Sequence, residues 1–498
     1  MAQPYYITTA INYPNGPPHI GHAYEAIAAD VIARFQRSRG RDVRFQTGTD
    51  EHGLKMAQAA RAKGMEPQVF ADKMSSLFLD MDKTLNIDYD SFIRTSDPAH
   101  HRASQAIWTA MAQKDDLYLG RYEGWYSVRD EAYYDESELS VGEGGQKLSP
   151  QGTEVEWTVE ESWFFRLSNY GQKLLDHYSA NPDFIRPESR RNEVVRFVEG
   201  GLSDLSISRT SFDWGVKVPQ SDGHVMYVWL DALTNYLTGL GYPDDTELWK
   251  RYWPADVHLM GKDVVRFHAV YWPAFLMSAG LELPRQVYGH GFLLSRGEKM
   301  SKSVGNVVDP MALAKRFGVD QLRYFLMREV PFGQDGSYSP EAIVNRVNAE
   351  LANSFGNLAQ RILSMIYKNL DGVIPAAADA PEDRELLKAV DSAIEELNRR
   401  FEDFAFSAGL EAWMGAVFAC NAYVDTAAPW ALRKTDPERM AEVLGTLVAA
   451  VRKLAEAVVP VIPQSAGRLI ATIDEGLHGG LGQPVAIFPR LELDEKRE

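Results

Sequence analysis

An alternation of strand and helix patterns over residues 1–50 limits the fold of this chain more than any other feature of its sequence. A β-branched and aromatic run at 5–11 leads into a loop at 12–18 that is rich in proline, glycine and asparagine. Apolar residues with helical spacing follow at 23–36, and a second strand is predicted at 43–47. This order is typical of a parallel sheet, in which ligands bind at the carboxyl ends of the strands. The loop at 12–18 and its counterpart after the second strand are therefore candidate binding segments.

The middle of the chain interrupts this α/β pattern and then returns to it. Residues 118–213 contain short aromatic strands at 125–128 and 132–134, and we interpret this region as an insertion. The α/β pattern resumes after the insertion, with a strand predicted at 225–230 and a helix at 264–279.

From residue 341 onward the strand signal nearly vanishes. Apolar residues then recur at helical spacing, which is typical of a helical bundle. The sequence therefore predicts an α/β class protein, with a Rossmann-type parallel-sheet domain, an inserted connective domain and an α-helical domain. The predicted boundaries are 1–117 for the first half of the sheet domain, 118–213 for the insertion, 214–340 for the second half and 341–498 for the helical domain.

Composition excludes several classes of protein. Cys420 is the single cysteine, so neither an internal disulfide nor a cysteine-based zinc site can form within the chain. It lies in an apolar run, where a small buried filler is expected rather than a nucleophile. The N-terminus lacks a signal-peptide pattern and no apolar stretch reaches the length of a membrane span, so we expect a cytoplasmic protein with no membrane partner. The net charge of −17 argues against binding nucleic acid by bulk charge.

Two histidines, His19 and His22, lie at the predicted junction between the first loop and its helix. The start of a helix offers N–H groups and the positive end of its dipole, which favour phosphate. Imidazoles at this place can donate hydrogen bonds to phosphate oxygens as charge grows on them, and Gly21 allows a close approach. For this spacing alone, a pair of histidines that caps the helix or binds a metal is the alternative.

A second polar segment lies between a predicted strand and a helix, and it contains Lys299, Met300, Ser301, Lys302 and Ser303. Two lysines with hydroxyls and glycines nearby suit a triphosphate, because such a loop can close on a substrate and bring positive charge to the transition state. A solvated basic loop is the alternative interpretation of this spacing.

Together, His-Ile-Gly-His at 19–22 and Lys-Met-Ser-Lys-Ser at 299–303 resemble the paired signature of the class I aminoacyl-tRNA synthetases. Over the whole chain the resemblance is to the methionyl branch of that family. The first motif of that branch resembles residues 10–22, its substrate-site segments resemble 48–53, 227–232 and 261–268, and its anticodon elements resemble 357–361 and 428–430. The resemblance implies ATP-dependent ligation of L-methionine to tRNA(Met) through methionyl-adenylate, with release of AMP and pyrophosphate, for translation.

The resemblance also implies a methionine pocket, in which Asp50 accepts hydrogen bonds from the ammonium group. The pocket would be lined by Ile11, Tyr13, Trp229, Leu233, Tyr236, Val264 and His268. An apolar, aromatic pocket with one carboxylate suits an unbranched amino acid that ends in a thioether. Without the resemblance, Trp229 would be interpreted as a core residue of a buried strand. Leu233 stands where some relatives have proline, which leaves its contact role open.

The ATP site implied by the resemblance consists of Pro14, Asn15, Gly16, His19, Gly21, His22, Gly261, Asp263, Lys299, Met300, Ser301, Lys302 and Ser303. Within this set the catalytic residues are His19, His22, Lys299 and Lys302, and Asp263 is expected to bind the ribose. No covalent enzyme intermediate is needed, so positioning and charge stabilisation would supply most of the catalysis. We expect Mg²⁺ to arrive with ATP rather than in a protein cage.

The resemblance places anticodon recognition on Asn357, Arg361 and Trp430. Trp430 follows a proline at a predicted helix start and would offer a stacking face to an unstacked base. Asn357 and Arg361 are four residues apart, so they share one face of a helix and can offer amide and guanidinium donors. For an unrelated helix, an exposed polar stripe would be the default interpretation of these two residues.

The insertion departs from the pattern of many relatives, which have a zinc knuckle built from C-x-x-C pairs. This chain has Ser127 and Asp130 at the matching positions. Thiolate ligands cannot be assembled from one cysteine, so we expect no structural zinc and an insertion held by its aromatic residues.

Two other kinds of function remain open. One is a class I synthetase for leucine, isoleucine, valine or cysteine, although no large editing insertion and no cysteine ligands are present. The other is a non-catalytic tRNA-binding or trafficking protein derived from a synthetase, against which the intact signature residues argue. We expect tRNA(Met), including the initiator tRNA, and L-methionine as partners, no DNA, and a monomer, because the chain ends soon after the helical domain.

The acidity of the chain is concentrated in two blocks. Residues 114–161 and 371–498 each have a net charge of −9, whereas residues 296–368 have a net charge of +3. We expect this acidic body to limit non-specific RNA binding and to leave RNA contacts to a few placed residues.

Overall fold

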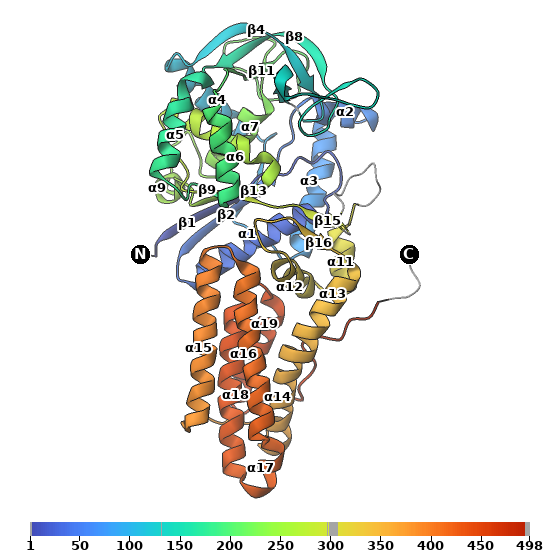
Figure 1. Cartoon of the computed structure of the whole chain (residues 1–498), viewed down its shortest axis with the longest axis vertical. Coiled ribbons are helices and arrows are strands. Elements are labelled where there is room, and N and C mark those ends of the chain that lie inside the picture. The colour runs from blue at the N-terminus through green and yellow to red at the C-terminus, as the bar shows by residue number, and fades with distance from the viewer. Residues whose placement is uncertain (1, 131, 296, 298–306, 494–498) are drawn as a thin grey trace. The chain divides into compact units, whose positions relative to one another are not determined.

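The computed structural model describes residues 2–130, 132–295, 297 and 307–493, which pack into two units. The first unit consists of Met1–Pro18, Arg39–Lys83 and Ile87–His290, and the second of His19–Ser38, Thr84–Asn86 and Gly291–Glu498. Figure 1 shows the elements of each unit.

A six-stranded parallel sheet forms the centre of the first unit, in the order β3-β2-β1-β13-β14-β9. Its strands are β1 (Pro4–Thr9), β2 (Asp42–Thr49), β3 (Ser91–Arg94), β9 (Ile185–Arg186), β13 (Val257–Gly261) and β14 (Val287–His290). The predicted parallel sheet is confirmed. The strand order reverses at β1, which pairs with β2 on one side and β13 on the other. Parallel sheets bind ligands at such a reversal, beyond the carboxyl ends of the strands.

The central strand β1 is buried along nearly its whole length, as its continuous apolar and aromatic sequence requires. The hydroxyl of Tyr6 donates to Gln46 Oε1 (2.8 Å) and lies 2.9 Å from the carbonyl oxygen of Tyr236. Burial raises the pKa of this hydroxyl far above its usual value, so it stays protonated as a donor. The strand ends at Thr9, so Ile11 lies in the loop after it.

The helices of the first unit are α2 (Leu54–Ala62), α3 (Pro67–Thr84), α4 (Pro98–Gln113), α5 (Gly171–Ala180), α6 (Glu188–Glu199), α7 (Val228–Leu233), α8 (Asn235–Thr238), α9 (Glu247–Tyr252) and α10 (Trp272–Ala279). Short 3₁₀ helices are η1 (Glu136–Glu138), η2 (Leu167–Tyr170) and η3 (Lys262–Val264), and η4 (Phe267–Tyr271) is a π-helix.

The strand predicted at 225–230 is wrong. Only β12 (Val225–Met226) is a strand there, paired with β11 (Ser208–Arg209), and Trp229 lies on α7. A short apolar run fits a strand and a buried helix equally well, so periodicity could not distinguish them. The helix predicted at 264–279 is divided among η3, η4 and α10.

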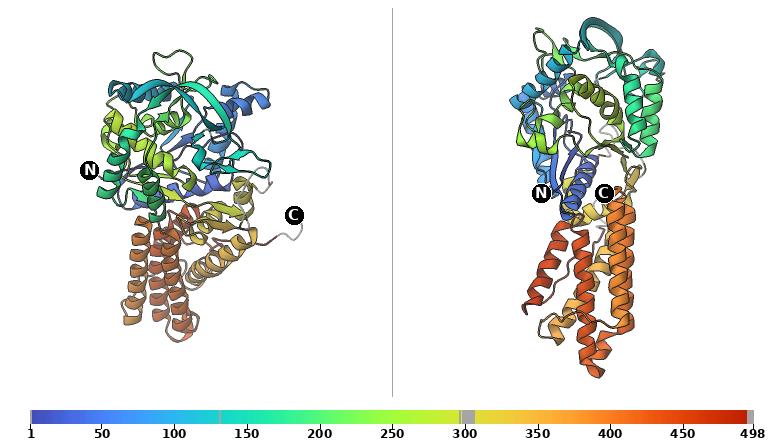
Figure 2. Two further views of the ribbon diagram at one scale, coloured as in Figure 1. Left: turned by 45° about the horizontal axis from the view of Figure 1, so that its top comes forward. Right: turned by 90° about the vertical axis from the view of Figure 1, so that its left-hand side faces the viewer.

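An antiparallel sheet in the order β10-β8-β4-β5 forms the body of the insertion. Its strands are β4 (Leu117–Ser127), β5 (Ala132–Tyr134), β8 (Glu156–Phe165) and β10 (Leu205–Ser206), and β6 (Ser140–Val141) pairs separately with β7 (Lys147–Leu148). The long pair β4 and β8 is in register from Leu117 opposite Phe165 to Tyr126 opposite Glu156 and forms the curved ribbon of Figure 2.

A knot of polar side chains ties together the tip of this sheet, at the positions that match the zinc knuckle of many relatives. Ser127 and Ser149 each lie 2.7 Å from the hydroxyl of Thr153, and all three side chains are buried. Asp130 accepts hydrogen bonds from Ser149 (2.8 Å), Tyr134 (3.0 Å) and Thr153. Aromatic pairs also contribute, as expected, but these hydrogen bonds are a second fastening that the sequence did not reveal. The residues at this tip do not fit zinc, because hydroxyls and one carboxylate stand in place of thiolates.

Helices dominate the second unit beyond its short parallel strands β15 (Leu293–Ser295) and β16 (Gly336–Tyr338). They are α1 (Ile20–Ser38), α11 (Pro310–Phe317), α12 (Val319–Glu329), α13 (Pro340–Arg346), the π-helix η5 (Val347–Gly356), α14 (Asn357–Asn369), α15 (Pro381–Glu402), α16 (Phe406–Ala427), α17 (Pro429–Thr435), α18 (Pro437–Val458) and α19 (Pro463–Leu477). Helices α15, α16 and α18 run side by side in Figures 1 and 2, which confirms the predicted bundle.

Within the described residues, one further expectation is met. Cys420 is buried on α16, and burial raises the pKa of its thiol to about 12, so it is a core residue. None of the helices in these residues is long and apolar enough to cross a membrane.

A fully buried ion pair joins four segments of the second unit. Arg323 on α12 donates to Asp30 on α1 (2.5 Å), and neither side chain is exposed. The same guanidinium donates to the carbonyls of Pro460 and Val461 (3.0 Å each) and of Leu85 (3.2 Å). Because every partner is buried, water cannot replace these hydrogen bonds. Removing one partner of the pair should therefore destabilise the fold.

Replacing Arg323 with methionine should therefore destabilise the second unit by about 3 kcal/mol or more, because several buried carbonyls lose a donor and the buried Asp30 carboxylate loses one of its two guanidinium partners, Arg34 remaining at 2.8 Å. Urea unfolding followed by hydrogen exchange of α12 and α18 amides would measure this. Lys453→Ala, which removes an exposed ion pair with Asp391 (2.6 Å), is the matched control and should change the midpoint little. Equal effects of the two substitutions would contradict the prediction.

The polar knot predicts that Ser127→Ala lowers stability by about 1–3 kcal/mol, because it removes the side-chain acceptor of the Asp130 backbone N–H and one of the hydrogen-bond partners of the buried Thr153 hydroxyl. Metal content should stay unchanged and near zero in both proteins. Thermal unfolding and elemental analysis by mass spectrometry provide the two readouts. Stoichiometric zinc in the purified protein would disprove the zinc-free insertion.

Candidate active site

Hydrogen bonds join the loops that follow β1 and β2 at the carboxyl edge of the parallel sheet. The backbone N–H of Asn12 donates to the carbonyl of Gly48 (2.9 Å), and that of Asp50 donates to the carbonyl of Asn12 (2.8 Å). The N–H of Ala10 donates to Leu259 on β13 (2.8 Å). These bonds fix the backbone of the two loops that carry Ile11, Tyr13 and Asp50. The prediction that both polar loops lie at the carboxyl ends of strands is confirmed.

Aromatic side chains form a cluster in the core of the first unit. Leu233 and Tyr236 are buried in this core, and Tyr13, Trp229 and Val264 pack against it. The ring of Trp229 stacks on Phe267 with centroids 3.8 Å apart and planes at 6°. Residues that the sequence assigned to one pocket therefore belong to one hydrophobic core. They come from loops and helices that are far apart in the chain.

The hydrogen bonds of His268 fix its tautomer. His268 lies on the π-helix η4, and its Nδ1 lies 2.9 Å from the carbonyl oxygen of Val264. A carbonyl only accepts, so the proton is on Nδ1, and Nε2 accepts from the hydroxyl of Tyr236 at 2.6 Å. Burial lowers the pKa of His268 to about 4, so the ring is neutral at neutral pH.

His258 on β13 lies behind this pair and is neutral for the same reason. Trp272 donates to its Nε2 (3.2 Å), so its Nδ1 carries the proton and donates to the hydroxyl of Thr8 at 2.7 Å. Burial, and then the charge of a protonated His268, would lower the pKa of His258 well below its usual value. Tyr236 stacks on this ring, with centroids 4.0 Å apart. The base of the cluster thus holds two neutral imidazoles, which suits an uncharged, polarisable side chain.

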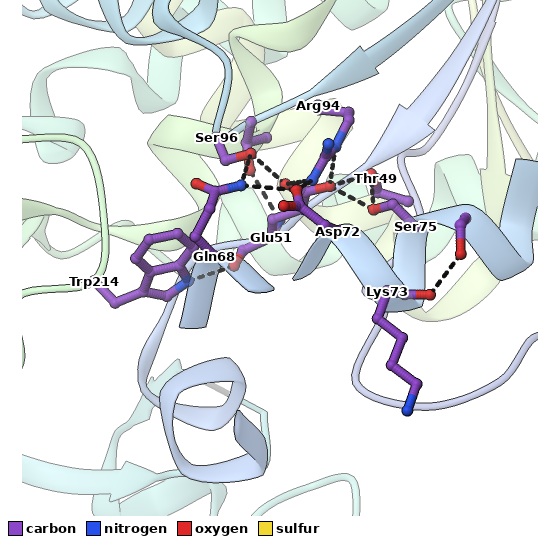
Figure 3. Close-up of polar contacts among 11 residues, drawn as sticks. Thr49, Glu51, Gln68, Asp72, Lys73, Ser75, Arg94, Ser96 and Trp214 are labelled. Carbon is purple, nitrogen blue, oxygen red and sulfur yellow. Dashed lines mark hydrogen bonds and ion pairs between the residues drawn. The ribbon is translucent and has the colours of Figure 1, made fainter. Parts of the chain in front are cut away.

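Glu51 anchors one side of the loop that carries Asp50 (Figure 3). Its carboxylate, which is fully buried, accepts from Arg94 at both oxygens (2.7 and 3.0 Å) and from Thr49 (2.8 Å), Ser75 and Ser96. Burial alone would raise the pKa of Glu51, but these hydrogen bonds outweigh it and hold the pKa below its usual value. The indole of Trp214 also donates to the Glu51 carbonyl at 2.6 Å. The loop is therefore fixed at its side chain and at its backbone.

His52 anchors the other side of the same loop. Its Nδ1 lies 2.6 Å from Asp231 Oδ2 on α7, and Nε2 of His100 on α4 lies 2.7 Å from the second oxygen of Asp231. The carbonyl of His52 accepts from the hydroxyl of Tyr13 at 3.0 Å. Sequence reasoning gave no role to Glu51, His52, His100 or Asp231. The available signal was that three of them lie in segments 48–53 and 227–232, which resemble the substrate-site segments of the family.

The residues assigned to the nucleotide in the first unit lie in the loop after β1, at the last residue of β13 and in η3. Asp263 is exposed in η3, directly after β13, and its Oδ1 lies 2.7 Å from where a β-carbon on Gly261 would be. A side chain at residue 261 would therefore require the Asp263 carboxylate to move. Pro14, Asn15 and Gly16 lie in the loop after β1, where the N–H of Asn15 donates to the Tyr13 carbonyl at 2.9 Å.

His19 and His22 lie at the start of α1, in the second unit. The N–H of Gly21 donates to His19 Nδ1 (3.1 Å), and the N–H of His19 donates to His22 Nδ1 (3.0 Å). An accepting ring nitrogen carries no proton, so each neutral ring has its N–H at Nε2. The rings stack with centroids 3.7 Å apart, and a β-carbon on Gly21 would lie 2.9 Å from the His19 ring. The histidines thus cap the first turn through Nδ1 and carry donors at Nε2.

The predicted triphosphate loop, with Lys299, Met300, Ser301, Lys302 and Ser303, lies outside the described residues.

The residues predicted to read the anticodon lie on two helices of the second unit. Asn357 is exposed in the first turn of α14, and Arg361 lies one turn further on. The Arg361 guanidinium lies 5.8 Å from the ring centroid of Trp430, which is 49% exposed, and 3.4 Å from Asp425. The structure therefore brings Arg361 and Trp430 together and adds Asp425, which the sequence did not suggest.

Comparison with known proteins gives matches over nearly the whole chain. A family profile described as "tRNA synthetases class I (M)" matches residues 5–363, and one described as "Anticodon binding domain of methionyl tRNA ligase" matches residues 374–478. The chain is 57% identical to the methionine–tRNA ligase of Brucella suis biovar 1 over 99% of each chain, and 56% identical to that of Mycobacterium bovis over 100% of this chain and 99% of the relative. A solved structure of Mycobacterium tuberculosis methionyl-tRNA synthetase with methionyl-adenylate superimposes with a TM-score of 0.95 at 55% identity, covering 98% of this chain and 100% of that one.

The neutral His268 predicts a dependence of stability on pH. Its pKa is about 4 in the folded protein and about 6.5 in an unfolded chain, so between these values only the unfolded state binds the proton. Its contribution to the stability of the sheet unit is therefore complete above pH of about 6.5 and is lost as pH falls toward about 4. His268→Gln should reduce the pH slope of the unfolding free energy by about 1.4 kcal/mol per pH unit in this window, whatever its effect at pH 7. Hydrogen exchange of the β1 and β13 amides measures the slope, and an unchanged slope would contradict the assignment.

Proposed function

Since this chain belongs to the methionyl branch of the class I aminoacyl-tRNA synthetases, we propose that its signature residues carry the two steps by which the enzyme makes methionyl-tRNA. The enzyme activates L-methionine with ATP and charges tRNA. In the first step the methionine carboxylate attacks the α-phosphate of ATP, forming methionyl-adenylate and releasing pyrophosphate. In the second, a hydroxyl of the terminal adenosine of tRNA(Met) attacks the activated carbonyl and AMP leaves.

Methionine recognition is the part of the proposal with the most support. One observation carries it: the carboxyl edge of the sheet gathers a carboxylate, Asp50, and an aromatic cluster whose histidine is neutral. Asp50 accepts hydrogen bonds from the ammonium group. Ile11, Tyr13, Trp229, Leu233, Tyr236, Val264 and His268 surround the side chain, and a thioether needs this apolar, polarisable environment rather than an ionic partner.

The nucleotide is held by loop and helix-terminus residues. Pro14, Asn15, Gly16, Gly21, Gly261 and Asp263 contact the adenosine and phosphates, with Asp263 on the ribose. His19 and His22 donate through Nε2 to phosphate oxygens as negative charge develops on them, which stabilises the transition state. Lys299 and Lys302 neutralise the leaving pyrophosphate, and Met300, Ser301 and Ser303 complete the loop that carries them. All these groups act by position and charge, without a covalent intermediate.

Mg²⁺, which neutralises part of the triphosphate charge, accompanies ATP in this proposal. We assign its coordination mainly to the phosphates and water, because Mg²⁺ usually keeps several waters and binds with substrate phosphates.

The helical unit reads the anticodon of tRNA(Met), in initiator and elongator tRNA alike. Trp430 stacks on an unpaired base, and Asn357 and Arg361 donate to base edges. Arg361 lies near both the Trp430 ring and the Asp425 carboxylate. These contacts orient its guanidinium before a base binds.

We propose domain boundaries at residues 117, 213 and 340. We assign contacts with a stem of the tRNA to the 214–340 segment. We also infer a monomer of 55.9 kDa that works in the cytoplasm and binds neither DNA nor membranes. Sedimentation velocity at several protein concentrations would test the oligomeric state.

Amino-acid-dependent exchange between ATP and pyrophosphate tests the function directly. We expect exchange with L-methionine, and none of comparable rate with leucine, isoleucine, valine or cysteine, because the cluster around His268 fits an unbranched thioether. Exchange with another amino acid would favour a different class I synthetase. Absence of exchange with all of them would favour a non-catalytic tRNA-binding protein.

Trp430→Ala separates anticodon reading from activation. Stacking of one base on an aromatic ring is worth about 1–3 kcal/mol, so kcat/KM for tRNA charging should fall about 5- to 150-fold while methionine-dependent exchange is unchanged. Tyr367→Ala is the matched control, because it removes an exposed ring from another face of α14 and should leave charging unchanged. Loss of exchange in Trp430→Ala, or equal loss of charging in both variants, would contradict the assignment.

A further inference from the structure

A carboxylate held between two histidines is buried in the first unit and has no role in the two proposed reaction steps. Asp231, His52 and His100 are each at most 2% exposed. The two oxygens of Asp231 lie 2.6 Å from His52 Nδ1 and 2.7 Å from His100 Nε2. On its far side the His100 ring lies 2.9 Å from the hydroxyl of Thr238. A carboxylate with both oxygens engaged this way has one allowed orientation.

This bridge joins two segments that the proposed methionine site uses. His52 is two residues after Asp50 in the loop after β2, and its carbonyl accepts from Tyr13. Asp231 is on α7, midway between Trp229 and Leu233. A helix of only six residues has little rigidity of its own, so its orientation depends on contacts such as this one.

The charge at the centre of the bridge makes it strong. Burial alone would raise the pKa of Asp231, but the charge and hydrogen bonds of His52 and His100 outweigh it and hold the pKa well below its usual value. The carboxylate is therefore ionised, and hydrogen bonds to an ionised group are about twice as strong as neutral ones. With Glu51 fixed by Arg94 and His52 fixed by Asp231, the two residues that directly follow Asp50 in the loop are both anchored.

We propose that Asp231 is a positioning residue for methionine binding, which acts through His52 to hold the Asp50 carboxylate in register with the α7 wall that carries Trp229 and Leu233. This inference rests on the proposed function. It assigns Asp231 no contact with substrate. Its effect must therefore appear in binding of the ammonium group, which Asp50 receives, more than in binding of the thioether.

Two inhibitors of methionine-dependent exchange distinguish these effects. L-Methioninol keeps the ammonium and the thioether but lacks the carboxylate, whereas the deaminated acid keeps the thioether and carboxylate but lacks the ammonium. In Asp231→Asn the inhibition constant of methioninol should rise about tenfold, since a misplaced charged group commonly costs this much or more. That of the deaminated acid should stay within about twofold.

Asp116→Asn is the matched control. Asp116 is also a buried aspartate, which accepts from Tyr170 and Ser278 (2.6 Å each) in another part of the same unit. It should lower the unfolding temperature without changing either inhibition constant. If Asp231→Asn weakens both inhibitors equally, or weakens neither, the positioning proposal is wrong and the bridge serves only the fold.

Two more variants complete the test. His100→Gln removes one arm of the bridge and should give the same pattern with a smaller rise, which keeps the test open if Asp231→Asn fails to fold. In an Asp50→Asn background, Asp231→Asn should add little to the loss of methioninol binding, because both act through one interaction. If Asp50→Asn itself leaves methioninol binding unchanged, the proposed methionine site fails rather than the bridge alone.

Discussion

The hydrogen bonds between the loop after β1 and the loop after β2 are the constraint on which the proposed methionine site depends. Asn12 takes part in both of them, as donor to Gly48 and as acceptor from Asp50. A parallel sheet brings these loops to one edge, but pairing within the strands ends at Thr9 and Thr49 and does not itself orient the loop residues beyond them. The two bonds add one β-bridge, between Asn12 and Thr49, beyond the ends of the strands. They therefore hold the loop residues at this edge of the sheet in fixed positions.

Hydrogen-bond partners compensate the buried charges around these loops. The buried carboxylates of Glu51 and Asp231 have partners on both oxygens: Arg94 and three hydroxyls for Glu51, and two histidines for Asp231. The aromatic cluster differs, because its two histidines are neutral. Each forms one hydrogen bond to a hydroxyl, His268 to that of Tyr236 and His258 to that of Thr8. The site therefore combines fixed charges outside with uncharged groups inside, which is the arrangement that a zwitterion with an apolar side chain requires.

The sequence predicted the parts of this structure that local patterns encode, and missed those that depend on long-range contacts. The sheet, the two loops, the bundle and the signature residues can be inferred from periodicity, turn chemistry and motif. The partner of His52 is 179 residues away, and nothing in the sequence around Asp231 indicates it. The strand at 225–230 failed for the same reason, because the choice between strand and helix depended on neighbours that only the folded chain supplies. At the insertion tip the sequence indicated the missing thiolates but not the hydroxyls that replace them.

Charged side chains are arranged differently in the helical unit and in the sheet unit. Its cations are largely committed to carboxylates: Arg361 to Asp425, Arg439 to Asp383 and Lys453 to Asp391. A surface whose cations are paired attracts the RNA backbone weakly, since each phosphate contact must compete with an existing ion pair. In the proposed mode of binding, recognition comes from exposed rings and from donors held in place, such as Trp430 and the Arg361 guanidinium beside it. The net charge of −17 is thus compatible with binding RNA, because it favours reading bases over holding phosphates.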